Sequence, residues 1–264
     1  MKTAHYYHQL FLEGCKINIQ RMKLYFPSLF IELLSNLLFV STVLIFWNVI
    51  YETFPNNKIG LTKNELYVYL AFVEIFVCLK TSFTYSTGKL WRVIYSGQLL
   101  SFMIRPVHPI VFFLLNSVRL HMLIPPFPII CYLLYQGKTE WTWFSLFLGL
   151  CVVVIALILV SLMELSFSLL SLWMTKMNAL DEIVDSFMNF TKYPLTIFNY
   201  GWQLLFTIVF PFTFYVTAPS FVALSGQMVE MKTWIYGFIC LILWGGMLII
   251  LWKKGLKRYD GYGG

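Results

Sequence analysis

Charged residues are scarce in this sequence. Lysine, arginine, aspartate and glutamate together make up 12% of the 264 residues, whereas 59% are hydrophobic. Soluble domains carry roughly 25% charged residues, so this chain has too little polar surface to cover a globule that faces water. The shortage of charge excludes an ordinary soluble domain and favours a protein that lies in a lipid bilayer.

Cysteines are few and have no regular spacing. Most of the five lie inside apolar stretches, without a CxxC pair: Cys15, Cys78, Cys131, Cys151 and Cys240. Zinc sites and disulfide frameworks need cysteines or histidines at characteristic intervals, and His5 with His8 reads as an ordinary surface pair. We therefore expect no metal site, and we interpret the cysteines as small apolar residues packed between helices.

Catalytic motifs are missing as well. Gly88-Lys89 is the nearest approach to a P-loop, but Leu90 follows where the motif requires serine or threonine, and no glycine stands five residues earlier. No HExxH or GxSxG sequence occurs. We therefore expect no catalytic residue and no cofactor in this chain. A membrane enzyme acting on lipid would need clustered His, Glu or Asp residues near one interface, and none stands out.

Apolar residues are present in long blocks. An α-helix needs about 20 residues to cross roughly 30 Å of hydrocarbon, and the blocks lack the alternation of barrel strands. The sequence therefore predicts an all-α membrane protein with six transmembrane helices. Four spans are expected at 24–50, 66–87, 143–172 and 234–252. A third span begins near Pro109 or Arg119, and a fifth follows the polar turn at 175–182 and ends near Pro194.

Prolines interrupt two of the apolar stretches. Three of them break the outer half of the third span: Pro125, Pro126 and Pro128. The stretch 195–219 is also apolar but broken, at Asn199, Gly201, Pro211 and Pro219. The fifth helix is expected to end, and the last helix to begin, on the same side of the membrane. We therefore predict that 195–219 is a re-entrant element that dips into the bilayer and turns back.

Basic residues are distributed unevenly in this topology. Most lysines and arginines fall on one side when both ends of the chain are cytoplasmic, as the positive-inside rule requires. The net charge of +7 then reflects membrane orientation, and we expect no nucleic-acid partner. The first 23 residues mix basic residues with apolar and aromatic ones, which predicts an amphipathic helix on the cytoplasmic membrane surface.

Ionisable residues also occur inside the predicted spans: Glu32, Glu74, Lys80, Glu164 and Asp185. Each costs several kcal/mol in hydrocarbon unless it is paired or hydrated. Counting depth from the helix ends places Lys80 level with Glu32 and Glu164, so we predict that Lys80 pairs with one of them. The pair can be a structural bridge, or it can serve proton coupling or contact with a substrate.

Three stretches resemble one protein family. FMIRPVHP at 102–109 resembles the L-x-R-P-x-x-P element of bacterial type-two ABC-transporter permeases, the membrane subunits of ABC exporters. PFTFYVTAP resembles the P-F-x-x-x-Y-x-x-P core that follows the fifth helix of these permeases. The tail WKKGLKRYDGYGG is similar to their W-x-x-G-L-x-R-Y-x-x-x-G ending. With the six-span plan, the resemblance covers essentially the whole chain and is closest to a subgroup of roughly 260 residues without a large extracellular domain.

The resemblance implies one transmembrane permease domain, 1–264, in the bacterial cytoplasmic membrane. It would pair with itself or a paralogue, contact membrane lipids, and bind two separate ATPase subunits that hold ATP and Mg²⁺. The family's exporters move drugs, peptides, lipids or polysaccharide, and the sequence does not identify the substrate. An ion-coupled secondary transporter that uses Glu32, Glu74, Lys80 and Glu164 is the alternative, although six spans without an internal repeat fit that class poorly.

The resemblance also assigns roles to segments and residues. The amphipathic helix at 1–23 would be the connecting helix, and the basic stretch 88–109 would dock on the ATPase. Its coupling residues would be Lys89, Arg92, Arg105, Pro106 and Pro109. The re-entrant element would line the exit path near the outer mouth through Gly201, Pro211, Phe212, Tyr215 and Pro219.

Overall fold

The computed structural model describes residues 26–54, 60–138, 140–174 and 177–259, with a few positions between 12 and 20. The regular structure of these residues is helical throughout, in agreement with the predicted all-α class. The predicted amphipathic helix at 1–23 lies outside the described residues except for those few positions.

Four helices are long and apolar enough to cross a membrane: α2 (Phe26–Thr53), α3 (Lys63–Leu79), α8 (Trp143–Leu169) and α12 (Met231–Leu256). They match the first, second, fourth and last predicted spans. Capping boxes fix where two of them begin. The Thr62 hydroxyl accepts from the Glu65 N–H at the start of α3, and the Thr142 hydroxyl accepts from the Ser145 N–H at the start of α8.

The third predicted span is a pair of bent helices. α6 (Pro109–Asn116) is followed by a short 3-10 turn, η3 (Leu120–Leu123), and by α7 (Phe127–Gln136). The two halves are bent by 54°. The helix begins at Pro109, and the expected interruption falls just before α7, where Pro126 caps the helix and Pro128 lies in its first turn. Prolines are tolerated there because the first N–H groups of a helix have no intrahelical acceptor.

The fifth predicted span is shorter than expected. α9 (Asn178–Met188) begins within the predicted polar turn, and a 3-10 turn, η5 (Asn189–Lys192), continues it. The backbone is extended at Tyr193 and Pro194, which ends the helix. This run is shorter than the roughly 20 residues that a full crossing needs. The structure therefore supports four crossings by length and composition, or up to six if each bent pair is one span.

The stretch before the last helix folds as two short helical segments that meet at nearly a right angle. α10 (Tyr200–Ile208) leads into a π-helical turn, η7 (Thr213–Thr217), and α11 (Ala218–Ser225), with a bend of 82° between the halves. Its turn contacts the middle of α12, because the Trp244 indole N–H donates to the Val209 carbonyl over 3.1 Å. Trp244 lies roughly 20 Å along α12 from its beginning. We call 200–225 the α10–α11 hairpin.

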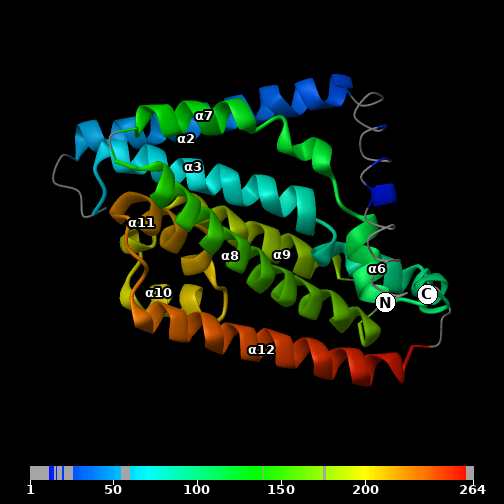
Figure 1. Ribbon diagram of the computed structural model, residues 1–264. Coiled ribbons are helices and arrows are strands. Elements are labelled where there is room, and N and C mark those ends of the chain that lie inside the picture. The colour runs from blue at the N-terminus through cyan, green and yellow to red at the C-terminus, as the bar shows by residue number, and fades with distance from the viewer. Residues whose placement is uncertain are drawn as a thin grey trace.

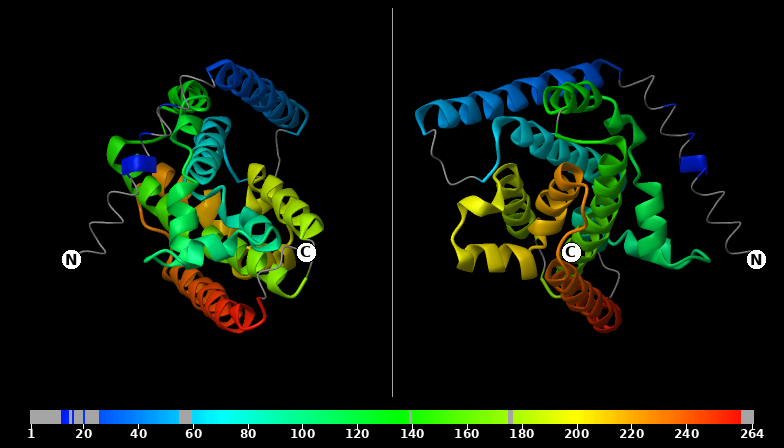
Figure 2. Two further views of the ribbon diagram at one scale, coloured as in Figure 1. Left: turned by 90° about the vertical axis from the view of Figure 1, so that its right-hand side faces the viewer. Right: turned by 60° about the vertical axis from the view of Figure 1, so that its left-hand side comes forward.

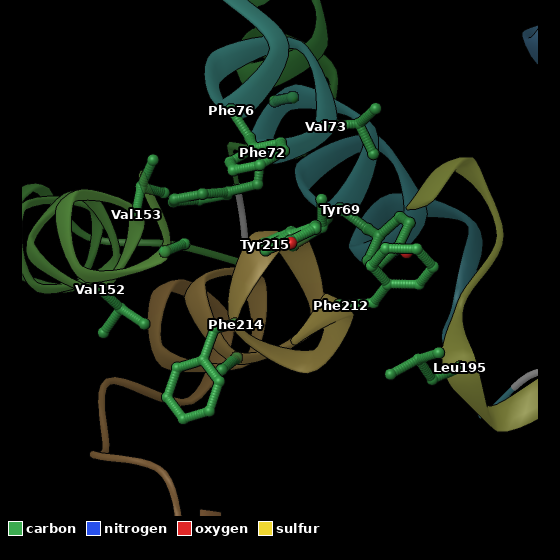
Figure 3. Close-up of a cluster of buried hydrophobic side chains, with 14 of the residues drawn as sticks. Tyr69, Phe72, Val73, Phe76, Val152, Val153, Leu195, Phe212, Phe214 and Tyr215 are labelled. Carbon is green, nitrogen blue, oxygen red and sulfur yellow. The ribbon is translucent and has the colours of Figure 1, made fainter. Parts of the chain in front are cut away.

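The helix α8 packs against α3, α11 and α12, and α2 and α7 lie on the far side of α3 (Figure 1). The α10–α11 hairpin lies at one end of the bundle, and α6 lies at the other, beside the end of α12 (Figure 1). α2 runs along the edge of the bundle, as both views in Figure 2 show, and most of its apolar side chains are exposed. The main core is made by α3, α8 and the hairpin, with Phe72, Phe76 and Tyr215 fully buried (Figure 3).

Candidate functional site

Lys80 and Glu164 form an ion pair between the end of α3 and α8. Lys80 Nζ lies 2.8 Å from Glu164 Oε1, and the side chains are 17% and 4% exposed. A charge in hydrocarbon is costly, and a partner at this distance offsets much of the cost. The structure confirms the predicted pairing of Lys80 and selects Glu164, not Glu32, as its partner.

The same carboxylate holds the chain that follows α3. The helix widens after Leu79 into a π-helical turn, η1 (Lys80–Thr84), and passes into a 3-10 turn, η2 (Thr87–Lys89). The Thr87 hydroxyl donates to Glu164 Oε2, and Ser168 Oγ donates to the Thr87 carbonyl over 2.8 Å. π-helical turns are rare and are found frequently at functional sites. This junction therefore ties α8 to the start of the segment 88–109.

Glu32 and Glu74 lie apart from this pair. Glu32 is exposed on α2, whereas Glu74 of α3 is 7% exposed and accepts a hydrogen bond from Asn36 Nδ2, over 3.1 Å. Both carboxylates line one cavity of about 240 Å³ between α2, α3 and residues 122–126. The predicted intramembrane charges thus form two groups instead of one cluster.

Residues 88–109 form a short helical layer, which we call the α4–α5 platform. α4 (Leu90–Tyr95) and α5 (Leu99–Met103) meet at Gly97, whose φ of +74° suits glycine. Their inner face packs against α6 and the end of α8 through buried residues: Leu90, Ile94, Leu99, Ile110, Phe113, Leu165 and Leu169. The chain after α12 is fastened here too, because the Tyr259 hydroxyl donates to the Ile94 carbonyl over 3.4 Å. Burial raises the pKa of Tyr259, so this hydroxyl stays a donor.

The outer face of the platform is exposed. Ile104 is 86% exposed at its tip, with Arg92, Arg105 and Pro106 exposed around it. The Arg105 guanidinium lies 4.2 Å from the centre of the Phe112 ring, a cation–π contact that holds the side chain in place. Arginine and exposed apolar side chains together are typical of protein interfaces.

Lys89 and Pro109 do not share this exposed face. Lys89 is 19% exposed, and its Nζ lies 3.6 Å from Asp185 Oδ2 on α9. Pro109 is half-buried at the first position of α6, where it starts the helix. Three of the five predicted coupling residues, Arg92, Arg105 and Pro106, therefore form the surface, whereas Lys89 holds the platform to α9.

The predicted exit-path residues lie mainly in the protein core. Phe212, Tyr215 and the prolines at 211 and 219 are buried, and Gly201 alone of the five is exposed, on α10. The Tyr215 ring stacks on Phe76 at 4.7 Å between ring centres, and its hydroxyl faces Met163 Sδ at 4.0 Å (Figure 3). These residues fasten the α10–α11 hairpin to α3 and α8.

Within the described ranges, no group of three or more His, Cys, Asp and Glu side chains is arranged to hold a metal ion. Sequence reasoning missed several polar contacts that the structure contains, among them Lys89 with Asp185 and Asn36 with Glu74. Both join helices whose relative rotation the sequence does not reveal. The sequence does contain a signal for the contact between Asn36 and Glu74, because both are polar residues inside apolar spans.

Comparison with known families agrees with this architecture. The model of a family described as ABC-2 family transporter protein matches residues 37–263, most of the chain. The match includes the platform, the Lys80–Glu164 pair and the α10–α11 hairpin. The search of curated proteins and the search of solved structures each found no significant match. From its family match and its apolar helices, the chain is an integral membrane protein that belongs to the ABC-2 transporter family.

Proposed function

We propose that this chain is the permease subunit of an ABC exporter in the bacterial cytoplasmic membrane. Two copies, or one copy and a paralogue, form the path, and two separate ATPase subunits bind ATP and Mg²⁺ and drive transport. This chain contributes no catalytic residue. The observation that carries the proposal is the α4–α5 platform, an exposed surface of Arg92, Ile104 and Arg105 on a buried base, within a chain of the ABC-2 family.

The base of the platform supports a role in transmitting force. Leu90 and Ile94 pack on the end of α8 through Leu165 and Leu169, and Thr87 is bonded to Glu164 on the same helix. A displacement of the platform by an ATPase would therefore move α8 directly. Because α8 also packs against the α10–α11 hairpin, movement at one end of the bundle can reach the other.

The α10–α11 hairpin supports a re-entrant element before the last helix. Its turn reaches Trp244, near the middle of α12, and its two ends lie towards the beginning of α12 (Figure 1). A segment that enters and leaves on one side does not add a crossing. In this topology the fifth crossing is 178–199, in which residues 193–199 continue the short run 178–192 to the outer surface, and both ends of the chain are cytoplasmic.

An ion-coupled secondary transporter is less well supported. A carboxylate that binds and releases a coupling ion needs access to water, but Glu164 is 4% exposed, paired with Lys80 and bonded to Thr87. These contacts favour a structural bridge. Glu32 and Glu74 remain open to a small ligand, as argued below.

The platform can be tested by reversing its charge. Replacing Arg92 and Arg105 with glutamate should reduce the amount of ATPase that co-purifies with the permease about tenfold, because two favourable charges at a docking surface become repulsive. The measurement is the ratio of ATPase to permease after affinity purification. Glutamine versions of both residues, which only remove charge, should give a smaller loss in the same direction.

The matched control for this experiment reverses two lysines at the other end of the bundle. Lys138 and Lys232 are both exposed, so changing them to glutamate alters the net charge equally without touching the platform. We expect this variant to retain the ATPase as the unaltered protein does. Equal retention of the ATPase by the platform variant and the control would contradict the proposed docking surface.

The topology can be tested by cysteine labelling in intact cells. Single cysteines at Gln136 and Ser101, both exposed, are introduced into a chain whose native cysteines are replaced by serine. A membrane-impermeant maleimide should label position 136 and leave position 101 unlabelled until the cells are opened. External labelling of position 101 would overturn the orientation.

A further inference from the structure

The cavity between α2 and α3 combines two carboxylates with an apolar wall. Its polar lining consists of Glu32, Ser35, Asn36, Glu74 and Thr81. The rest of the lining is apolar or weakly polar and includes Met122, Pro125 and Pro126. A cavity of about 240 Å³ has room for a small organic group and not only for a water molecule.

Glu74 has an oxygen that the protein does not use. Its side chain is 7% exposed, and Asn36 Nδ2 donates only to Oε2. Among the described residues, Oε1 accepts no hydrogen bond, although Glu74 lines the cavity. This oxygen keeps free acceptor capacity beside the cavity, so it is open to a ligand that supplies a hydrogen-bond donor.

Positive charge from the protein is located elsewhere. Among the described residues that line the cavity none is basic. Lys80 is on the same helix but is paired with Glu164. Lys192 lines a separate cavity of about 10 Å³ that Glu74 also borders, and its charge acts on Glu74 from that side, while its Nζ donates to Asn189 Oδ1 over 2.6 Å. Glu32 and Glu74 together thus leave the larger cavity with an excess of negative charge.

We propose that this cavity binds an amphiphile with a cationic nitrogen, an apolar amine or quaternary ammonium. The cationic head would lie between Glu32 and Glu74, and its apolar part would lie against Met122, Pro125 and the edge of α2. Because α2 is mostly exposed along its length, such a molecule could enter from the bilayer. This inference rests on the proposed function in one respect, because only in an exporter would the bound molecule be a cargo. Binding itself is independent of transport.

Cys78 reports on the site, because it is one of the residues that line the cavity, whereas Cys131 is exposed on α7 outside it. The full permease, with its ATPase subunits and without ATP, is placed in phosphatidylglycerol nanodiscs. The rate at which N-ethylmaleimide modifies each cysteine is measured by mass spectrometry. Benzyltrimethylammonium should slow modification of Cys78 and not of Cys131. Neopentylbenzene, the uncharged molecule of the same shape, should have no effect.

Two variants assign the protection to the carboxylates. Glu32→Gln lies on an exposed part of α2 and should leave the fold intact, and Glu74→Gln keeps the shape of the side chain and an acceptor for Asn36. In each, the benzyltrimethylammonium concentration for half-maximal protection should rise about tenfold, equivalent to 1.4 kcal/mol. Equal protection by neopentylbenzene, undiminished protection in both variants, or no protection of Cys78 would each overturn the proposal.

Changing the lipid of the nanodiscs shows whether the ammonium group belongs to a lipid headgroup or to a free amphiphile. If adding phosphatidylethanolamine protects Cys78 without a soluble cation, the ligand is a lipid headgroup. If only the soluble ammonium protects Cys78, the ligand is a free amphiphile. Both results support the site. Failure of these binding tests leaves the ATPase-docking test unaffected, so failure of the inference and of the proposed function can be told apart.

Discussion

Replacing Gly149 with leucine is expected to prevent the protein from folding stably. Gly149 lies in α8 where a Cβ atom would stand 2.7 Å from Phe72 Cζ and 2.9 Å from the Pro219 carbonyl oxygen. Phe72 is fully buried and the carbonyl is backbone of α11, so neither can give way at low cost. Alanine at this position should already destabilise by about 1–3 kcal/mol. The measurement is the amount of monodisperse protein that survives heating in detergent.

Gly246 provides the comparison. It lies in the middle of α12, and an added Cβ meets nothing within 4 Å. Gly246→Ala should therefore be neutral or slightly stabilising, because alanine favours a helix over glycine by about 1 kcal/mol. If Gly149→Ala is as stable as Gly246→Ala, the close approach of α8 to the α10–α11 hairpin is not as the structure describes.

Removing Lys80 is expected to destabilise the junction between α3 and α8. Lys80→Ala leaves the Glu164 carboxylate, which is 4% exposed, with the Thr87 hydroxyl as its remaining described side-chain donor. Polar contacts between membrane helices contribute about 0.6 kcal/mol on average and up to about 1.7. The loss should lie at the upper end of that range, because the pair is buried and charged. It would be seen as a lower midpoint of thermal unfolding.

A double-mutant cycle separates the pair from other effects of the substitution. Lys80→Ala with Glu164→Ala removes both charges, so the double variant should be more stable than either single variant. Glu32→Ala serves as the second partner in a parallel cycle and should add independently to Lys80→Ala. Strict additivity for Lys80 and Glu164 would mean that the ion pair contributes no coupling to stability.

The long helices could be predicted from the sequence because their signals are local. Unbroken apolar runs and capping residues such as Thr62 and Thr142 set the limits of α3 and α8. Depth alone predicts that Lys80 pairs with Glu32 or Glu164, since residues at one level of neighbouring helices can meet, and the structure selects Glu164. The two π-helical turns and the 82° bend of the α10–α11 hairpin could not be predicted. They depend on tertiary contacts such as the stacking of Phe76 on Tyr215.

Depth does not reveal which way a side chain faces. Lys89 is one of the docking residues that the family resemblance implies, but in the structure it lies in the turn before α4 and meets Asp185 of α9. Asn36 and Glu74 were both inside apolar spans, yet their contact needs the rotation of α2 about its axis. The exit-path residues carried the same ambiguity, because an apolar residue in a broken helix can line a path or fill a core. The structure places Phe212 and Tyr215 in the core.

The π-helical turn at Lys80–Thr84 sets the register of everything that follows it. A π turn contains one residue more than the α-helical turn it replaces, and each residue of a helix rotates the chain by about 100°. A chain that lacked one residue here would regain regular α-helical bonding, but Thr87 would face away from Glu164 and the buried side of α4 would turn towards solvent. Deleting the extra residue would therefore rotate the whole platform, so that its buried and exposed faces change places.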